Sequence, residues 1–240
     1  MKRVKMLALS LALIFTGAVA SQAQSVDEIV NRHLAAMGGA DKLNSIKSLY
    51  IEGNMEIQGM EIPIKQWIIQ NKALRLEMDV MGTSNIQVVK PTTGWMQMPV
   101  SNVPDPTDME PEQVKTAAKQ LDISGDLTNY AAKGSKVELK GKETLDGVDT
   151  YHLVMTDKDG KKQDLFLDAK TYYIVKKVMT AEQQGQEMTI ETLISDYRKG
   201  DDGFISAHAI EQPLTGMKMT FSKVNYNVDV DNKLFDKPTN

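Results

Sequence analysis

The chain contains no cysteine, which excludes a disulfide framework, a catalytic thiol, the usual structural zinc sites and iron–sulfur clusters. It has only three histidines, and they lie far apart without the spacing of metal ligands. Basic residues also do not outnumber acidic ones, with 28 Lys and Arg against 32 Asp and Glu. The formal net charge is −4, so the basic surface typical of nucleic-acid binding is missing. We expect no metal, no other cofactor and no nucleic-acid partner.

The motifs of the common catalytic sites are missing as well. The sequence has no G-x-S-x-G, no P-loop, no H-E-x-x-H, no S-x-x-K and no G-x-G-x-x-G. Its 32 acidic residues would allow a glycosidase-type carboxylate pair to meet in space, but no feature of the sequence selects one. We therefore predict that the chain is not an enzyme. A hydrolase with an unrecognised carboxylate pair is the less favoured alternative.

A long hydrophobic run occurs only at the N-terminus. Three basic residues precede an apolar run, Met6–Phe15, and two small-x-small sites follow, ending at Ala20 and Ala23. The run is too short to span about 30 Å of hydrocarbon as a helix. We expect residues 1–23 to be a signal peptide, cleaved after Ala20 or Ala23. The remaining chain would be exported to the periplasm and would not be an integral membrane protein.

The rest of the chain begins with one helix. Ser25 and Glu28 have the spacing of a capping box, and Gly38-Gly39 provides the left-handed end that a helix needs. A short turn, residues 40–44, is expected next. We predict that residues 24–240 form a single domain.

From Ser45 onward, apolar and polar residues alternate, without error in Leu74–Val80, and Asp146-Gly147 and Asp159-Gly160 are typical hairpin turns. No helices of 10–15 residues separate the strands, which excludes parallel β-α-β units. The pattern predicts an α+β fold, mainly antiparallel β, with about ten or eleven strands. We expect a bend or bulge at Gly53 and a bulge near Ser222, where the apolar parity changes.

Residues 91–133 interrupt the strand series. Four prolines between residues 99 and 111 predict a loop, and Asp108 or Glu110 could cap a helix that has Pro111 in its first turn. Val114 and Leu121 supply a thin apolar stripe on that helix.

Methionine is abundant, with 15 residues in the chain, many of them on the predicted strand faces. Such side chains can simply fill a core, or they can form an adaptable surface for apolar ligands. Two short helices cover only part of a curved sheet, so the remainder is either collapsed side chains or a ligand cavity. Trp67 shares parity with Ile69 and could line that cavity or be an ordinary core anchor.

Four stretches of the sequence resemble the LolA-like outer-membrane lipoprotein-sorting proteins of the Bacteroidetes type. They are residues 33–49 (HLAAMGGADKLNSIKSL), 72–77 (KALRLE), the insert with EPEQ at 110–113 and LTNYAAKG at 127–134, and the ending 228–235 (VDVDNKLF). The resemblance implies an incomplete, half-open β-barrel whose helices cover the concave face. It also implies a periplasmic carrier that binds acyl chains of lipids or lipoproteins.

Mapped onto this chain, the resemblance implies a cavity wall of apolar strand residues and a lid of two helices. Membrane-bound donor and acceptor proteins would be further partners, and we expect a monomer. The expected wall residues are Leu49, Ile51, Met55, Ile57, Trp67, Ile69, Leu74, Leu76, Met78, Val80, Met155, Leu165, Leu167, Met188, Ile190, Met217, Met219 and Phe221. The expected lid residues are Ile29, Leu34, Met37, Met109, Val114, Ala117 and Leu121.

A second interpretation is a sensory or structural binding module with a filled core. In that case the exposed segment from Pro99 to Pro111 would contact a protein partner. A ligand cavity of several hundred Å³ would count against this interpretation.

Overall fold

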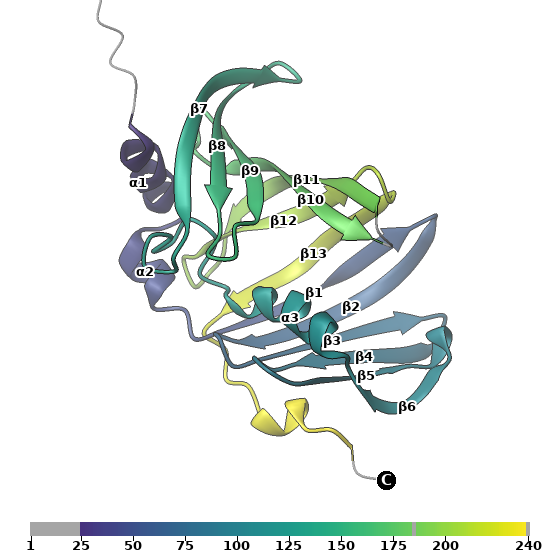
Figure 1. Cartoon of the computed structure of the whole chain (residues 1–240). Coiled ribbons are helices and arrows are strands. Elements are labelled where there is room, and N and C mark those ends of the chain that lie inside the picture. Colours follow the sequence, from purple (N-terminus) through teal and green to yellow (C-terminus); the bar gives the residue numbers. More distant parts are fainter. Residues whose placement is uncertain (1–24, 184–185, 239–240) are drawn as a thin grey trace, which may run out of the picture.

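A computed structural model of the chain describes residues 25–183 and 186–238, so the expected signal peptide lies outside the described residues. The described strands form one antiparallel, thirteen-stranded sheet that curls around α3 (Figure 1). Its edge strands β6 and β7 do not pair with each other, which leaves an incomplete barrel and confirms the predicted fold class. The strands are β1 (Ser48–Ile57), β2 (Met60–Ile69), β3 (Ala73–Val80), β4 (Thr83–Val89), β5 (Gly94–Met98), β6 (Val103–Asp108), β7 (Lys136–Leu145), β8 (Val148–Thr156), β9 (Lys162–Asp168), β10 (Ile174–Gln183), β11 (Gln186–Lys199), β12 (Ile205–Gln212) and β13 (Met217–Tyr226).

The expected number of strands was too low because two strands lie where the prolines predicted a loop. β5 and β6 pair through Met96 with Thr107 and Trp95 with Asp108, and the short helix η1 (Pro99–Ser101) connects them. Pro104 and Pro106 lie within β6. Proline has no N–H to donate, but β6 is an edge strand with only one neighbour, so proline is tolerated there. Prolines on an edge strand also oppose pairing with a further chain.

The sheet consists of two meanders that meet at one pair of strands. The chain runs through β1 to β6, crosses the concave side and returns through β7 to β13, which pairs with β1. Glu52 lies opposite Lys223 and Gly53 opposite Phe221, which leaves Ser222 bulged out of the register. The predicted bulge at this position is therefore confirmed.

The two predicted helices are present, and a third short helix replaces the expected turn at residues 40–44. In α1 (Val26–Ala36) the Ser25 hydroxyl accepts a hydrogen bond from the Glu28 N–H at 3.1 Å. In α3 (Pro111–Ala117) the Glu110 N–H donates to the side chain of Gln113 at 3.0 Å, as in a capping box. The other short helices are α2 (Ala40–Asn44), η2 (Ala118–Leu121) and η3 (Asn232–Phe235).

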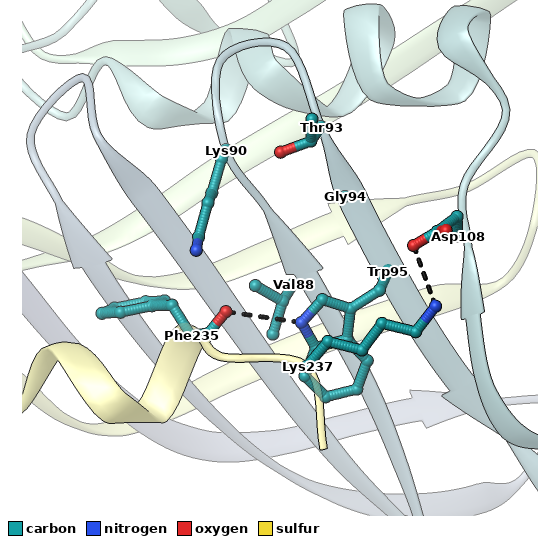
Figure 2. A pocket seen from close by; sticks show the side chains of 8 residues that line it. All are labelled: Val88, Lys90, Thr93, Gly94, Trp95, Asp108, Phe235 and Lys237. Carbon is teal, nitrogen blue, oxygen red and sulfur yellow. Dashed lines mark hydrogen bonds and ion pairs between the residues drawn. The ribbon is translucent and has the colours of Figure 1, made fainter. Parts of the chain in front are cut away.

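The apolar cores lie on both faces of the sheet. On the concave face, α1 covers the half formed by β8 and β9, and α3 covers the half formed by β1 to β4. On the convex face, Phe235 of the C-terminal segment packs with Trp95 and Val88 (Figure 2). None of the helices within the described ranges is long and apolar enough to cross a membrane.

Candidate functional site

The strand register defines which side chains share the concave face. Leu49 lies opposite Ile68, Ile68 opposite Leu74, and Leu74 opposite Val89, so these four residues form one row across β1 to β4. All four are buried. The side chains that cover this row come from α3, η2 and the residue before them, namely Met109, Val114, Ala117, Ala118 and Leu121.

The second half of the concave face is covered in a similar way. The α1 side chains Ile29 and Val30, with Leu127 from the crossing segment, pack against one row of strand residues. These strand residues lie opposite one another in the register of β8, β9 and β10. The row contains Tyr151, Leu153, Met155, Leu165, Leu167 and Ile174.

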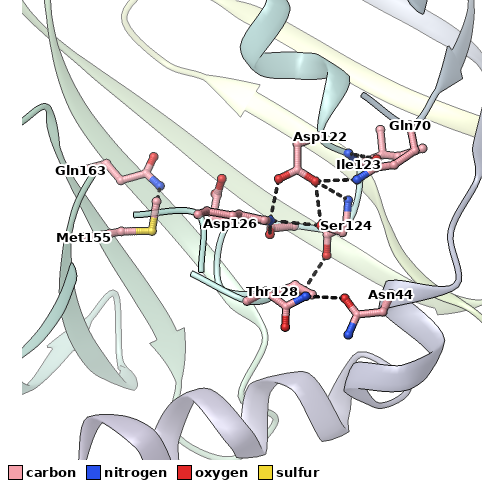
Figure 3. A network of polar contacts seen from close by, with 12 residues as sticks. Asn44, Gln70, Asp122, Ile123, Ser124, Asp126, Thr128, Met155 and Gln163 are labelled. Atoms are coloured by element: carbon pink, nitrogen blue, oxygen red, sulfur yellow. Dashed lines mark hydrogen bonds and ion pairs between the residues drawn. The ribbon is translucent and has the colours of Figure 1, made fainter. Parts of the chain in front are cut away.

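Residues 122–135, here called the crossover loop, connect the two covered halves. Figure 3 shows how polar side chains fix it across the concave side. The Gln70 amide donates to Asp122 at 2.9 Å, and Lys133 forms an ion pair with Asp122 at 2.5 Å. Lys177 of β10 donates to Asp126 at 2.5 Å. The loop is therefore bound both to the β2–β3 turn and to β10.

The ion pair between Asp126 and Lys177 is half-buried, with 33% of the Asp126 side chain and 30% of the Lys177 side chain exposed. Burial alone would raise the pKa of the Asp126 carboxyl, but the charge and hydrogen bond of Lys177 outweigh burial and hold this pKa below its ordinary value. Asp126 is therefore a charged latch between the crossover loop and the sheet.

Beyond both covers, a stretch of the concave face belongs to neither covered cluster. It lies toward the end of the sheet that carries the β1–β2 and β12–β13 turns. There Met219 of β13 has Met55 of β1 on one side and Ile210 of β12 on the other. These side chains do not belong to the clusters that α1 and α3 form with the sheet. We call this stretch the open trough. Its half-buried residues are Met55, Ile57, Met78, Val80, Met188, Ile190, Ile210, Met217 and Met219, its exposed ones are Met60 and Met179, and Ile62 and Ile64 between them are buried.

The expected wall residues are thus distributed over three places. Leu49, Ile51, Leu74, Leu76 and Phe221 lie under α3. Met155, Leu165 and Leu167 lie under α1. The remaining ones on the concave side, Met55, Ile57, Met78, Val80, Met188, Ile190, Met217 and Met219, form most of the open trough.

For Trp67 and Ile69 the expected placement was wrong. They lie opposite Tyr50 and Ser48 and alternate with Ile68, so they face the convex side, where they pack near Phe235. Residues 67–69 are apolar on both faces because α3 covers one side and the C-terminal segment the other. Alternation cannot assign a face in such a stretch.

The expected lid residues all lie on the covering elements. Ile29, Met109, Val114 and Leu121 are buried, and Leu34, Met37 and Ala117 are half-buried. Leu34 and Met37 also contact the cluster of Leu43, Ile46 and Phe204 beside α2. No sequence pattern points to Lys177 or Asp126, because the latch depends on a contact between residues 51 positions apart.

Described residues outside the open trough also form hollows. One, of about 500 Å³, lies between α1 and the crossover loop and is lined by Asp27, Val30, Asn31, Leu34, Leu127, Asn129, Tyr130, Ala131 and Ala132. Another, of about 180 Å³, lies on the convex side beside Trp95 and Lys90 (Figure 2). There Trp95 donates to the Phe235 carbonyl at 3.4 Å and Lys237 pairs with Asp108 at 3.0 Å.

His33 predicts a pH dependence of the α1 cover. Its Nδ1 donates to the Tyr172 carbonyl at 2.8 Å, and burial, with a smaller effect of the Lys177 charge, lowers the pKa of His33 below its ordinary value. A lowered pKa in the folded state gives stability that is complete above the ordinary pKa of about 6.5 and is lost as the pH falls through the folded-state pKa. We expect the free energy of unfolding to fall by up to about 1.4 kcal/mol per pH unit between the ordinary pKa and the lower folded-state pKa.

Urea unfolding of the wild type and His33→Gln between pH 8 and 5 measures this effect. The difference between the two proteins should grow in favour of the variant as the pH falls. A constant difference over this range would contradict the prediction.

Comparison with known proteins identifies the fold. No family model matches the chain, and no curated protein sequence does so. Among solved structures, it is similar to a DUF1329 family protein from Desulfovibrio piger (TM-score 0.57, 16% identity, 89% of this chain and 98% of that chain). It is also similar to a LolA superfamily protein from Nitrosomonas europaea (TM-score 0.54, 14% identity, 90% and 99%). A third is a putative outer-membrane lipoprotein-sorting protein domain from Vibrio parahaemolyticus (TM-score 0.52, 15% identity, 88% and 95%). The chain has the LolA-like fold.

Proposed function

We propose that this protein binds the acyl chains of lipids or lipoproteins in the open trough and carries them through the periplasm. The observation that supports the proposal most directly is the trough itself. It leaves about ten apolar side chains of the concave face half-buried or exposed, next to two halves that helices cover. The similarity to a lipoprotein-sorting protein domain is in line with such a role.

The physical chemistry of the trough suits a reversible carrier. Each CH₂ group removed from water contributes about 0.8 kcal/mol, so one acyl chain gains useful affinity without any directional contact. Methionine side chains are unbranched and polarizable, so a floor that contains Met55, Met188 and Met219 can adapt to chains of different shape. Release would follow when the covers or the crossover loop shift, since only a change in shape weakens a contact of this kind.

Lipid bound to the purified protein is the decisive measurement. We expect native mass spectrometry and solvent extraction of protein from the periplasm to show acyl lipid, and we expect fatty acids to displace a fluorescent acyl probe. A protein that carries no lipid and binds no probe would contradict the proposal.

The alternative is a binding module that acts through its outer surface. The observation in its favour is that each cover packs directly on the sheet. Ile29, Leu153 and Leu165 are fully buried in the half under α1, and Leu74 and Val89 are buried in the half under α3. Its surface would be the region of η1 and β6 that joins Met98 to Pro111. A protein that lacks lipid but captures a periplasmic partner through this region would favour the alternative.

A further inference from the structure

Exposed apolar side chains gather at the hairpin turns of one end of the sheet. Four of the six large apolar residues that are exposed within the described ranges lie at such turns. Met60 follows the β1–β2 turn, Met81 lies in the β3–β4 turn, Val100 lies between β5 and β6, and Leu214 lies between β12 and β13. The antiparallel register places these turns at the same end, on the right in Figure 1. We call this set of four residues the apolar rim.

Met81 shows that folding alone does not explain the rim. Its side chain is 88% exposed and its φ is +53°. The left-handed region disfavours most side chains, and tight hairpin turns prefer Asn, Asp or Gly at this position. Met81 thus gains no burial and adopts an unfavourable backbone conformation. A role at the surface accounts for a methionine there better than a role in the turn.

The rim is continuous with the open trough. Met60 belongs to both, and Val80, a trough residue, precedes Met81 in the chain. Met217, also a trough residue, follows the turn that contains Leu214. Three of the four rim residues therefore belong to the trough or lie within three residues of it along the chain.

The charges near the rim restrict what can dock on it. Within four residues of the rim along the chain lie five carboxylates and one lysine, Lys218, which pairs with Glu211 at 3.7 Å. An anionic surface would be repelled by this excess of negative charge. The five carboxylates are Glu56, Glu61, Glu77, Asp79 and Glu211.

We propose that the apolar rim docks on the surface of a neutral, zwitterionic phospholipid bilayer, so that the trough opens onto the lipid. The four side chains lie on four separate turns. Separate apolar side chains insert individually between lipid head groups, whereas a protein interface needs a continuous complementary surface. The inference rests on the proposed function, because it names the surface from which the trough would receive or deliver its ligand.

Flotation of the purified protein with phosphatidylcholine vesicles tests the proposal. We expect wild type to bind, and Met60→Ser, Met81→Ser and Leu214→Ser each to weaken binding about tenfold, since each removes one inserted apolar side chain. Adding phosphatidylglycerol, an anionic lipid, to the vesicles should weaken the binding of the wild type at low salt. Val148→Ser is the matched control, because Val148 is exposed at the opposite end of the sheet.

Met81→Asn distinguishes a surface role from a structural one. Asn suits the left-handed conformation, so the variant should unfold at higher urea concentration than wild type while it binds vesicles more weakly. The tryptophan fluorescence that Met81→Trp adds should be quenched by brominated phosphatidylcholine, and that added by Val148→Trp should not. Vesicle binding that is unchanged in the Met60, Met81 and Leu214 variants would overturn the proposal, as would a rim that only pairs with a second copy of the chain.

The acyl-probe assay without vesicles separates this inference from the proposed function. Met81→Ser and Leu214→Ser, which change residues outside the trough, should keep wild-type affinity for a soluble acyl probe. If rim variants lose vesicle binding while no probe binds at all, the docking surface stands and the carrier function fails. If the probe binds and vesicles do not, the carrier function stands and the docking surface fails.

Discussion

Replacing Met219 by Glu is expected to weaken binding of an acyl probe at least about hundredfold. Met219 lies in the middle of the open trough, opposite Met55 on β1 and Ile210 on β12. A carboxylate at this position must lose water when the acyl chain binds, and burying an unpaired charge costs several kcal/mol. A hundredfold loss corresponds to about 2.7 kcal/mol. Fluorescence titration with the probe at pH 7.5 measures it.

Thr220→Glu is the matched control for this experiment. Thr220 is the next residue of β13, is exposed and faces the convex side, so the same charge is added to the same strand without entering the trough. Its affinity for the probe should equal that of wild type. Equal affinities for the Met219 and Thr220 variants would show that the ligand does not lie in the open trough.

Replacing Gly53 by Val is expected to destabilise the protein by at least about 3 kcal/mol, or to prevent folding. A Cβ atom at Gly53 would lie 2.1 Å from the Thr220 carbonyl oxygen and 2.9 Å from the Phe221 Cα. Both contacts are with backbone, so no side-chain rotation can relieve them. The pair β1–β13 is the connection between the two meanders of the sheet, and the clash would separate the strands there. Urea unfolding followed by circular dichroism measures the effect.

Asn54→Val provides the comparison for Gly53→Val. Asn54 is the next residue of β1 and is exposed, so it receives the same β-branched side chain without a clash. We expect its free energy of unfolding to stay within about 0.5 kcal/mol of wild type. If both variants are equally stable, the close approach of β1 and β13 at Gly53 does not matter for the fold.

Local sequence patterns were sufficient to predict those elements that depend only on residues close to one another in the chain. The Ser25 cap and the Gly38-Gly39 end of α1 depend on neighbouring residues only, as does the Asp146-Gly147 turn with positive φ at both positions. The bulge at Ser222 was also visible, because an extra residue in a strand changes the parity of its apolar side chains. Prolines misled the prediction for β6, because whether a strand lies at a sheet edge is not a local property.

The sequence by itself determined the antiparallel sheet and the two covering helices. It also contains more apolar strand residues than two small helices can cover. Only the tertiary structure decided which of these residues are covered, which face Trp67 and Ile69 occupy, and that Lys177 binds Asp126. The physical reason is that alternation records whether a side chain avoids water, but not which element removes the water from it. Where both faces of a strand are dry, or where a charged group finds a partner distant in sequence, only the packing of the whole chain supplies the answer.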